Sequence, residues 1–159
     1  MCETACSFYH TGRVNRNNAR IKVVHHYETG IDGPVVCVQC KERFCLDCSE
    51  SAISVGKYGE IKISHTVCNF CKKCAKACPI GAIDPFEAFM YVCDLCGGDP
   101  KCVKACTESA VTYLADVSGE VSLQNIKSQT NKMNISEKKA FLTHHRGKRL
   151  RENWRDSQC

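Results

Sequence analysis

The sequence lacks any continuous hydrophobic run of the roughly 18 to 20 residues that a membrane-spanning helix requires. Its first residues, MCETACSFYHTG, also lack the cationic segment and apolar stretch of a signal peptide, and they contain no twin-arginine pair. We therefore expect a cytoplasmic protein that does not insert into a membrane.

Common catalytic signatures are missing as well. The chain has no combination of serine, histidine and aspartate typical of hydrolases, no paired carboxylates, no P-loop and no glycine-rich dinucleotide fingerprint. We therefore expect no catalytic residue in this chain.

Cysteine, by contrast, is abundant, with 15 among 159 residues. Such a density indicates either a disulfide-bonded secreted protein or a metal-binding protein of a reducing compartment. Disulfides between cysteines three positions apart would constrain the chain little, and structural zinc sites usually combine two Cys-x2-Cys pairs about a dozen or more residues apart. Here the third and fourth cysteines follow within a few positions, which favours iron and sulfide. A zinc module that binds nucleic acid is the alternative from a different class of function.

The clearest motif is CNFCKKCAKACP, from Cys68 to Pro79. Its spacing is Cys-x2-Cys-x2-Cys-x3-Cys-Pro, in which three close cysteines hold one 4Fe-4S cubane and the fourth binds a neighbouring one. Pro79 stops a helix from continuing beyond the fourth cysteine. The motif therefore predicts a loop and one helical turn around a cluster.

This unit occurs three times, at residues 36–53, 67–83 and 92–111. Each copy begins with Val-Cys-x2-Cys and ends with Cys-x3-Ala followed by Ile or Val. Little sequence remains for an ordinary hydrophobic core, so we expect cluster binding to supply much of the folding free energy. The metal-free chain should be largely unfolded.

The repeat also predicts short strands. Each unit should begin at the end of a strand, and its final Ala-Ile or Ala-Val pair should begin a return strand. The strand ends are expected at Val36, Val67 and Val92. Further segments predict a strand and turn over 21–27, a hairpin over 53–63 and a closing strand over 110–114.

Charge and composition change along the chain. Residues 1–120 contain 13 Lys and Arg against 14 Asp and Glu, a net −1, whereas residues 121–159 contain 9 against 3, a net +6. We divide the chain into a cluster-binding domain, 1–115, and a basic extension, 116–159, that packs on the body or on a partner. The extension predicts a short capped helix near Ser136, with Trp154 as an anchor and Cys159 as an exposed thiol.

Other polar residues have simpler interpretations. His25 and His26 fall in the first strand, and we expect one ring to be packed and the other solvated. Five lysines crowd the cysteine motifs, where they would offset cluster charge on exposed turns or form a docking surface for an acidic partner. They are Lys72, Lys73, Lys76, Lys101 and Lys104.

The motifs between residues 2 and about 115 resemble the multi-cluster ferredoxin-like electron-transfer subunits that accompany molybdenum and tungsten enzymes and hydrogenases. The stretch CDLCGGDPKCVKAC is most similar to the iron–sulfur subunits of tungsten aldehyde oxidoreductases and class II tungsten benzoyl-CoA reductases. The resemblance implies an α+β fold of tandem bacterial-ferredoxin modules, with pseudo-twofold symmetry and short hairpins and helices around the clusters.

The resemblance also implies three ligand sets, in which the fourth cysteine of one unit serves its neighbour. Site A would comprise Cys37, Cys40, Cys45 and Cys78. Site B would comprise Cys48, Cys68, Cys71 and Cys74. Site C would comprise Cys6, Cys93, Cys96 and Cys102. A fourth cubane would need Cys2, Cys106 and two earlier cysteines that this chain lacks, so we expect three clusters, or four if the native chain begins earlier.

A subunit of this kind would relay single electrons to or from a tungsten-containing catalytic subunit. The expected partners are that tungsten- or molybdenum-pterin subunit and a soluble ferredoxin or another electron-transfer subunit, in a hetero-oligomer without nucleic acid. The alternative of the same fold is the electron-transfer subunit of a hydrogenase or a formate dehydrogenase.

Overall fold

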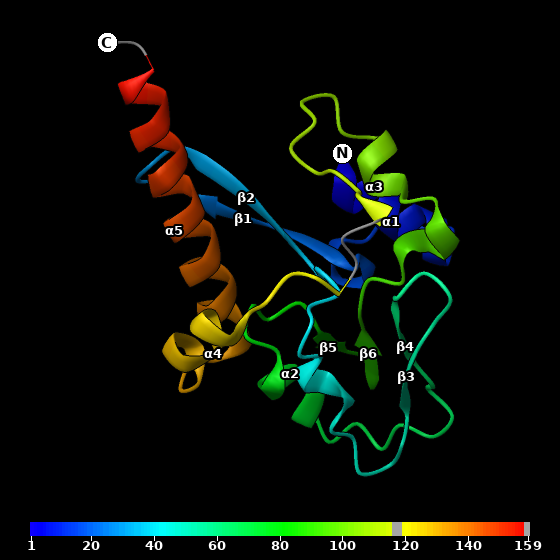
Figure 1. The fold of residues 1–159 in the computed structure, drawn as a ribbon. Helices are drawn as coiled ribbons and strands as arrows, with labels where there is room; N and C mark the ends of the chain where they lie inside the picture. Colours follow the sequence, from blue (N-terminus) through cyan, green and yellow to red (C-terminus); the bar gives the residue numbers. More distant parts are fainter. Residues whose placement is uncertain (116–118, 158–159) are drawn as a thin grey trace.

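The computed structural model describes residues 1–115 and 119–157. Three antiparallel hairpins carry its strands (Figure 1). The first joins β1 (Ile21–His26) and β2 (Ile31–Val36), the second joins β3 (Ile53–Val55) and β4 (Ile61–Ile63), and the third joins β5 (Asp84–Phe86) and β6 (Phe89–Tyr91). The strand and turn predicted over 21–27 and the hairpin predicted over 53–63 are confirmed.

Two of the helices, α2 and α3, are short and lie within the second and third cysteine motifs. The α-helices are α1 (Cys2–Thr11), α2 (Lys73–Ala77), α3 (Lys101–Lys104), α4 (Gln124–Thr130) and α5 (Ile135–Asp156). Short 3-10 turns cover Arg16–Asn18, Phe44–Leu46 and Leu95–Gly98. Short helices and short hairpins of this kind are consistent with a small ferredoxin-like α+β fold.

Two predicted strands were wrong. Val36 ends β2 and Val92 follows β6, but Val67 lies 51% exposed in a turn where its N–H bonds to the Ser64 carbonyl. Residues 110–114 form no strand within the part of the chain that the structure describes. The N–H of Ala110 instead donates to the Cys106 sulfur, and Val111 packs against Cys6 and Cys102.

The expected short helix near Ser136 is instead the 22-residue α5, which begins one residue earlier. Asn134 caps it, because the Asn134 Oδ1 accepts from the Glu137 N–H at 2.9 Å and the Glu137 carboxylate accepts from the Asn134 N–H at 2.7 Å. Trp154, the expected anchor, is 65% exposed. Cys159 and the domain boundary at 116 lie outside the described residues.

The extension packs along the first hairpin. Figure 1 shows α5 beside β1 and β2, and α1 near α3 on the other side of the molecule. Leu123 and Leu142 share a buried cluster with Val35, Ile80 and Ala82. The first half of α5 is therefore held by the body, and among the described residues none after Gly147 is buried.

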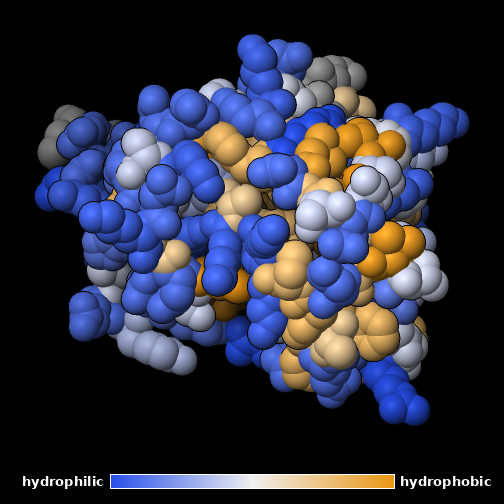
Figure 2. All heavy atoms as spheres, turned by 90° about the horizontal axis from the view of Figure 1, so that it is seen from below, coloured by the Kyte–Doolittle hydropathy of each residue, from blue (hydrophilic) through white to orange (hydrophobic). Residues whose placement is uncertain are grey.

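Sulfur atoms contribute much of the interior. One buried cluster contains Cys45 and Cys74 with Ile61, Ile83 and Met90. In a view from below, Figure 2 shows mostly hydrophilic side chains toward the side of α4 and α5 and hydrophobic ones gathered on the other half. Over the described residues, no helix has the length and apolar character of a membrane span.

Candidate metal centres

The four cysteines of site A surround one small cavity between β2 and α2. Cys37 follows β2, Cys45 lies in the 3-10 turn Phe44–Leu46, and Cys78 directly follows α2 as its C-cap. Together with Cys40 they line the cavity, whose other walls include Ile80 and Leu123. The Ala82 N–H donates to the Cys78 sulfur at 3.3 Å. Two repeat units thus contribute to one site.

Site B lies around a second cavity, lined by Cys48, Cys68, Cys71 and Cys74. Cys48 comes from the first repeat unit, and the other three come from the second. Among the cysteines that the structure describes, Cys71 alone is exposed. Site B is therefore the site nearest to solvent.

Site C joins the N-terminal helix to the third repeat unit. Cys6 in α1 and Cys102 in α3 share a buried cluster, and the Arg20 N–H donates to the Cys6 sulfur at 3.2 Å. Burial is the main reason that the pKa of Cys93 is raised to about 12; the Leu95 N–H lowers this pKa, and nearby Cys102 and Cys6 raise it. Burial likewise raises the pKa of Cys102 to about 11, with contributions from Cys6 and Cys96.

The other two sites show the same electrostatic pattern. Burial raises the pKa of Cys45 to about 12, followed by the effects of Cys78 and Cys40. The pKa of Cys74 is raised to about 11, mainly by burial. The Ala75 N–H lowers this pKa, whereas the neighbouring Cys68, Cys48 and Cys71 raise it. Four thiols placed this close together ionise readily only beside a cation, which is what a cluster of iron provides.

Sulfur spacing separates iron clusters from single zinc ions. Zinc with sulfur ligands at about 2.3 Å would bring its four sulfurs to about 3.8 Å from one another. Within 1–115 and 119–157, the ligand atoms that gather within 4.8 Å of one another are those of His10, Asp94 and Cys96, and no three cysteines do so. The described cysteine sets therefore do not show the close sulfur spacing of a single zinc site.

The group around Asp94 was missed by the sequence analysis. The His10 Nε2 lies 3.4 Å from the Asp94 Oδ1 and 3.8 Å from the Cys96 sulfur, and the Arg20 Nη1 lies 2.5 Å from the Asp94 Oδ2. His10 comes from α1 and Arg20 directly precedes β1, so no local pattern could have indicated this pairing.

Among the cysteines in the described part of the chain, Cys2 and Cys106 line neither the cavity of site A nor that of site B. Cys2 packs against the cluster that contains Cys6 and Cys102. Burial raises the pKa of Cys106, but backbone N–H groups, including that of Ala110 at 3.2 Å, outweigh it and lower the pKa overall. Both cysteines lie on the side of the molecule where site C is found.

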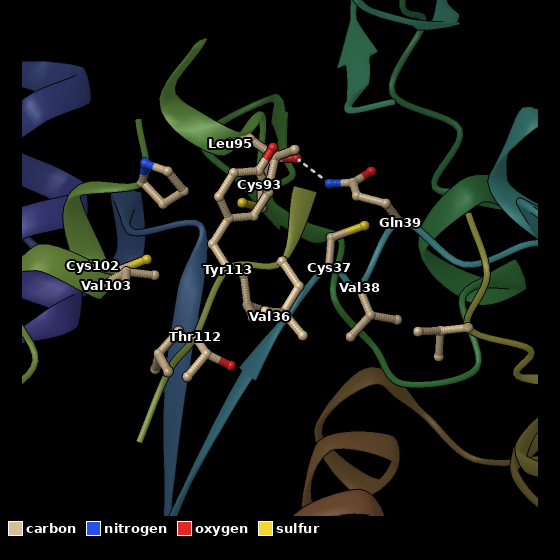
Figure 3. A pocket seen from close by; sticks show the side chains of 14 residues that line it. Val36, Cys37, Val38, Gln39, Cys93, Leu95, Cys102, Val103, Thr112 and Tyr113 are labelled. Carbon is tan, nitrogen blue, oxygen red and sulfur yellow. Dashed lines mark hydrogen bonds between the residues drawn. The ribbon is translucent and has the colours of Figure 1, made fainter. Parts of the chain in front are cut away.

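The three sites form a row. Cys45 of site A and Cys74 of site B belong to one buried cluster. Cys37 of site A and Cys93 of site C line one cavity of about 220 Å³, as Figure 3 shows. Site A therefore lies between sites B and C.

Comparison with known proteins agrees with this chemistry. A family model for the 4Fe-4S binding domain matches residues 61–84. The polyferredoxin-like subunit of an aliphatic sulfonate oxidoreductase from Pyrococcus furiosus is 37% identical over 123 residues, covering 75% of this chain and 70% of the relative. An uncharacterized ferredoxin of Methanocaldococcus jannaschii is 41% identical over 97 residues, covering 60% of this chain and 57% of its own length.

A third relative is the beta subunit of an NADH-dependent phenylglyoxylate dehydrogenase from Aromatoleum evansii, 32% identical over 129 residues. The match covers 76% of this chain and 29% of that subunit. These relatives confirm the predictions of 4Fe-4S clusters and of a chain that transfers electrons without a catalytic site of its own. The chain belongs to the ferredoxin-like 4Fe-4S polyferredoxin family.

Proposed function

We propose that this chain relays single electrons through three 4Fe-4S clusters, as the iron–sulfur subunit of a larger oxidoreductase. The observation that carries this proposal is the row of three four-cysteine sites, B, A and C, in one small chain. A cubane whose irons all have protein ligands exchanges one electron and has no open position for a substrate. The sites therefore serve transfer between partners.

The proposed ligands are the twelve cysteines of sites A, B and C. Cys48 and Cys78 are exchanged between the first two repeat units, which is the arrangement of a tandem ferredoxin module with pseudo-twofold symmetry. The sequence departs from the family's usual spacing at Cys45-x2-Cys48, yet Cys48 lines the same cavity as Cys68, Cys71 and Cys74. Cys2 and Cys106 remain outside the three sets, which supports three clusters rather than four.

Electrons would enter or leave at site B. Cys71 is exposed there, and the neighbouring Lys72 and Lys73 are exposed as well. Cationic side chains beside an exposed electron-transfer site attract an acidic redox protein and speed its encounter. A soluble ferredoxin fits this description.

The catalytic partner in this proposal is a tungsten-containing subunit of the aldehyde oxidoreductase or benzoyl-CoA reductase type, in a hetero-oligomer. Support comes from the similarity of CDLCGGDPKCVKAC to the iron–sulfur subunits of such enzymes. It also comes from relatives that are named as subunits of an oxidoreductase and of a dehydrogenase.

Iron and acid-labile sulfide per chain test the proposal. Anaerobically purified protein should hold about twelve irons, because each of three cubanes contains four. About sixteen irons would show a fourth cluster, and about eight would show that one site fails. A colourless, zinc-loaded protein without sulfide would overturn the proposal. Metal analysis of the co-purified complex tests the partner, since this proposal places tungsten in the catalytic chain.

A further inference from the structure

Gln39 is a buried polar residue between two proposed ligands of site A, Cys37 and Cys40. Its side chain is 3% exposed, and both ends of the amide are bonded. The Gln39 Nε2 donates to the Cys93 carbonyl oxygen at 3.2 Å, as Figure 3 shows, and the Gln39 Oε1 accepts from the Ile61 N–H at 3.1 Å. One side chain thus joins the loop of site A to Cys93 of site C and to β4.

The repeat shows what is particular to Gln39. The residues equivalent to it in the second and third units are Phe70 and Leu95. All three have left-handed backbone conformations, with φ of 50°, 57° and 57°. The conformation therefore belongs to the Cys-x2-Cys loop, whereas the amide occurs in the first unit alone. An apolar residue would suit the backbone of this position equally well.

Burying an amide is costly unless its hydrogen bonds are made, so Gln39 needs both of its partners. The partners fix its direction, because Ile61 begins β4 whereas Cys93 lies in the loop after β6. The backbone of Gln39 is held too, since its carbonyl accepts from the Gly119 N–H at 3.0 Å. Hydrogen bonds on three sides leave the loop of site A little freedom to shift relative to Cys93.

We propose that Gln39 is a positioning residue that fixes the separation of sites A and C and so sets the electronic coupling between them. This inference rests on the proposed function, because it requires clusters at both sites. The step concerned is the transfer of one electron from a reduced cluster to an oxidised one, with no bond or proton exchanged. Gln39 provides a hydrogen-bonded connection that runs from Cys37 through the 38–39 backbone and the amide to Cys93.

The test compares full-length, cluster-loaded Gln39→Leu with wild type and with Gln124→Leu, which changes an exposed glutamine of α4. Leucine is the natural residue at the equivalent position 95. Electron paramagnetic resonance of the fully reduced protein reports magnetic interactions between neighbouring clusters. We expect iron and sulfide to stay at wild-type levels, the A–C interaction to weaken several-fold, and the A–B interaction to remain. The Gln124→Leu variant should match wild type.

A Gln39→Leu protein with complete clusters and an unchanged A–C interaction would overturn the inference while leaving the proposed function intact. Wild-type protein with fewer than three clusters would instead overturn the proposed function. If Gln39→Leu itself loses iron, Gln39→Asn decides, because it keeps an amide that is one methylene too short to reach both partners. A wild-type A–C interaction in Gln39→Asn would then contradict the role of Gln39, and a weakened one would support it.

Discussion

The ammonium group of Lys138 donates to the backbone carbonyl of Lys76 at 2.6 Å. It also donates to the Cys78 carbonyl at 3.1 Å, and Lys127 donates to the Ala77 carbonyl at 2.7 Å. These three carbonyls end α2 and have no partner within that helix, and a cation is favourable beside them. The basic extension therefore caps the short helix that leads into Cys78.

Replacing Lys138 by methionine should destabilise the protein. The change keeps most of the side-chain volume but removes the charged donor of the Lys76 carbonyl and leaves the Cys78 carbonyl with the Gly81 N–H at 3.4 Å, which costs about 1.5–3 kcal/mol. Denaturant unfolding of the cluster-loaded protein measures this cost. The control is Lys132→Met at an exposed lysine, where we expect a change within about 0.5 kcal/mol. Equal stabilities of the two variants would show that the contacts of Lys138 contribute nothing.

Cys6→Ser should remove the cluster of site C. Cys6 is buried against Cys102. Its loss leaves the cluster of site C with three cysteine ligands instead of four, so iron should fall from about twelve to about eight per chain. Cys2→Ser is the matched control in the same helix and should retain all of the iron. If Cys6→Ser retains its iron, or Cys2→Ser loses iron, the assignment of Cys6 as the fourth ligand of site C is wrong.

Acid should promote loss of iron to a chelator. In the folded chain without bound clusters, the thiols of Cys45 and Cys93 have a pKa of about 12, so both would be protonated near neutral pH. A cluster binds the thiolate and so depresses the pKa of its ligands, and this stabilisation is lost as pH falls and protons compete for sulfur. The iron released at equilibrium, measured at pH values about one unit apart, should therefore increase from pH 9 to pH 6. A flat profile would contradict thiolate ligation.

Reversing two charges beside site B should slow electron exchange with an acidic soluble ferredoxin. The double variant Lys72→Glu and Lys73→Glu should lower the second-order rate about tenfold at low ionic strength, and added salt should reduce the difference. Stopped-flow mixing measures the rate, with Lys132→Glu as the control for total charge. An equal effect of the control would show that the ferredoxin docks elsewhere.

Local patterns determined which parts of the molecule could be predicted. The repeat frame located the cysteine loops, and the alternation around Gly56 and Gly59 located the second hairpin. The ligand sets came from resemblance to a family, since spacing alone does not bring Cys6 to the third unit. Val67 did not end a strand because β4 closes earlier and the chain turns at Ser64 before the cysteine loop.

Contacts between distant segments could not be predicted. The amide of Gln39 donates to the Cys93 carbonyl, and the ammonium of Lys138 donates to a carbonyl at the end of α2; both partners are distant in the sequence. The sequence shows each as one polar residue among many. The full length of α5 was missed because its sequence is polar, and its first half is stabilised by packing on the first hairpin rather than by an evident apolar stripe.

The exposure of Cys71 affects how the clusters are damaged by oxygen in air. Oxidants in solution reach site B first, because Cys71 is exposed there whereas the four cysteines of site C are buried. Cys48 of site B lies three positions after Cys45 of site A, so damage at the surface loosens the loop that serves the interior. In air, the clusters should therefore be lost in the order site B, site A, site C. A docked partner that covers Cys71 would protect site B from oxidants.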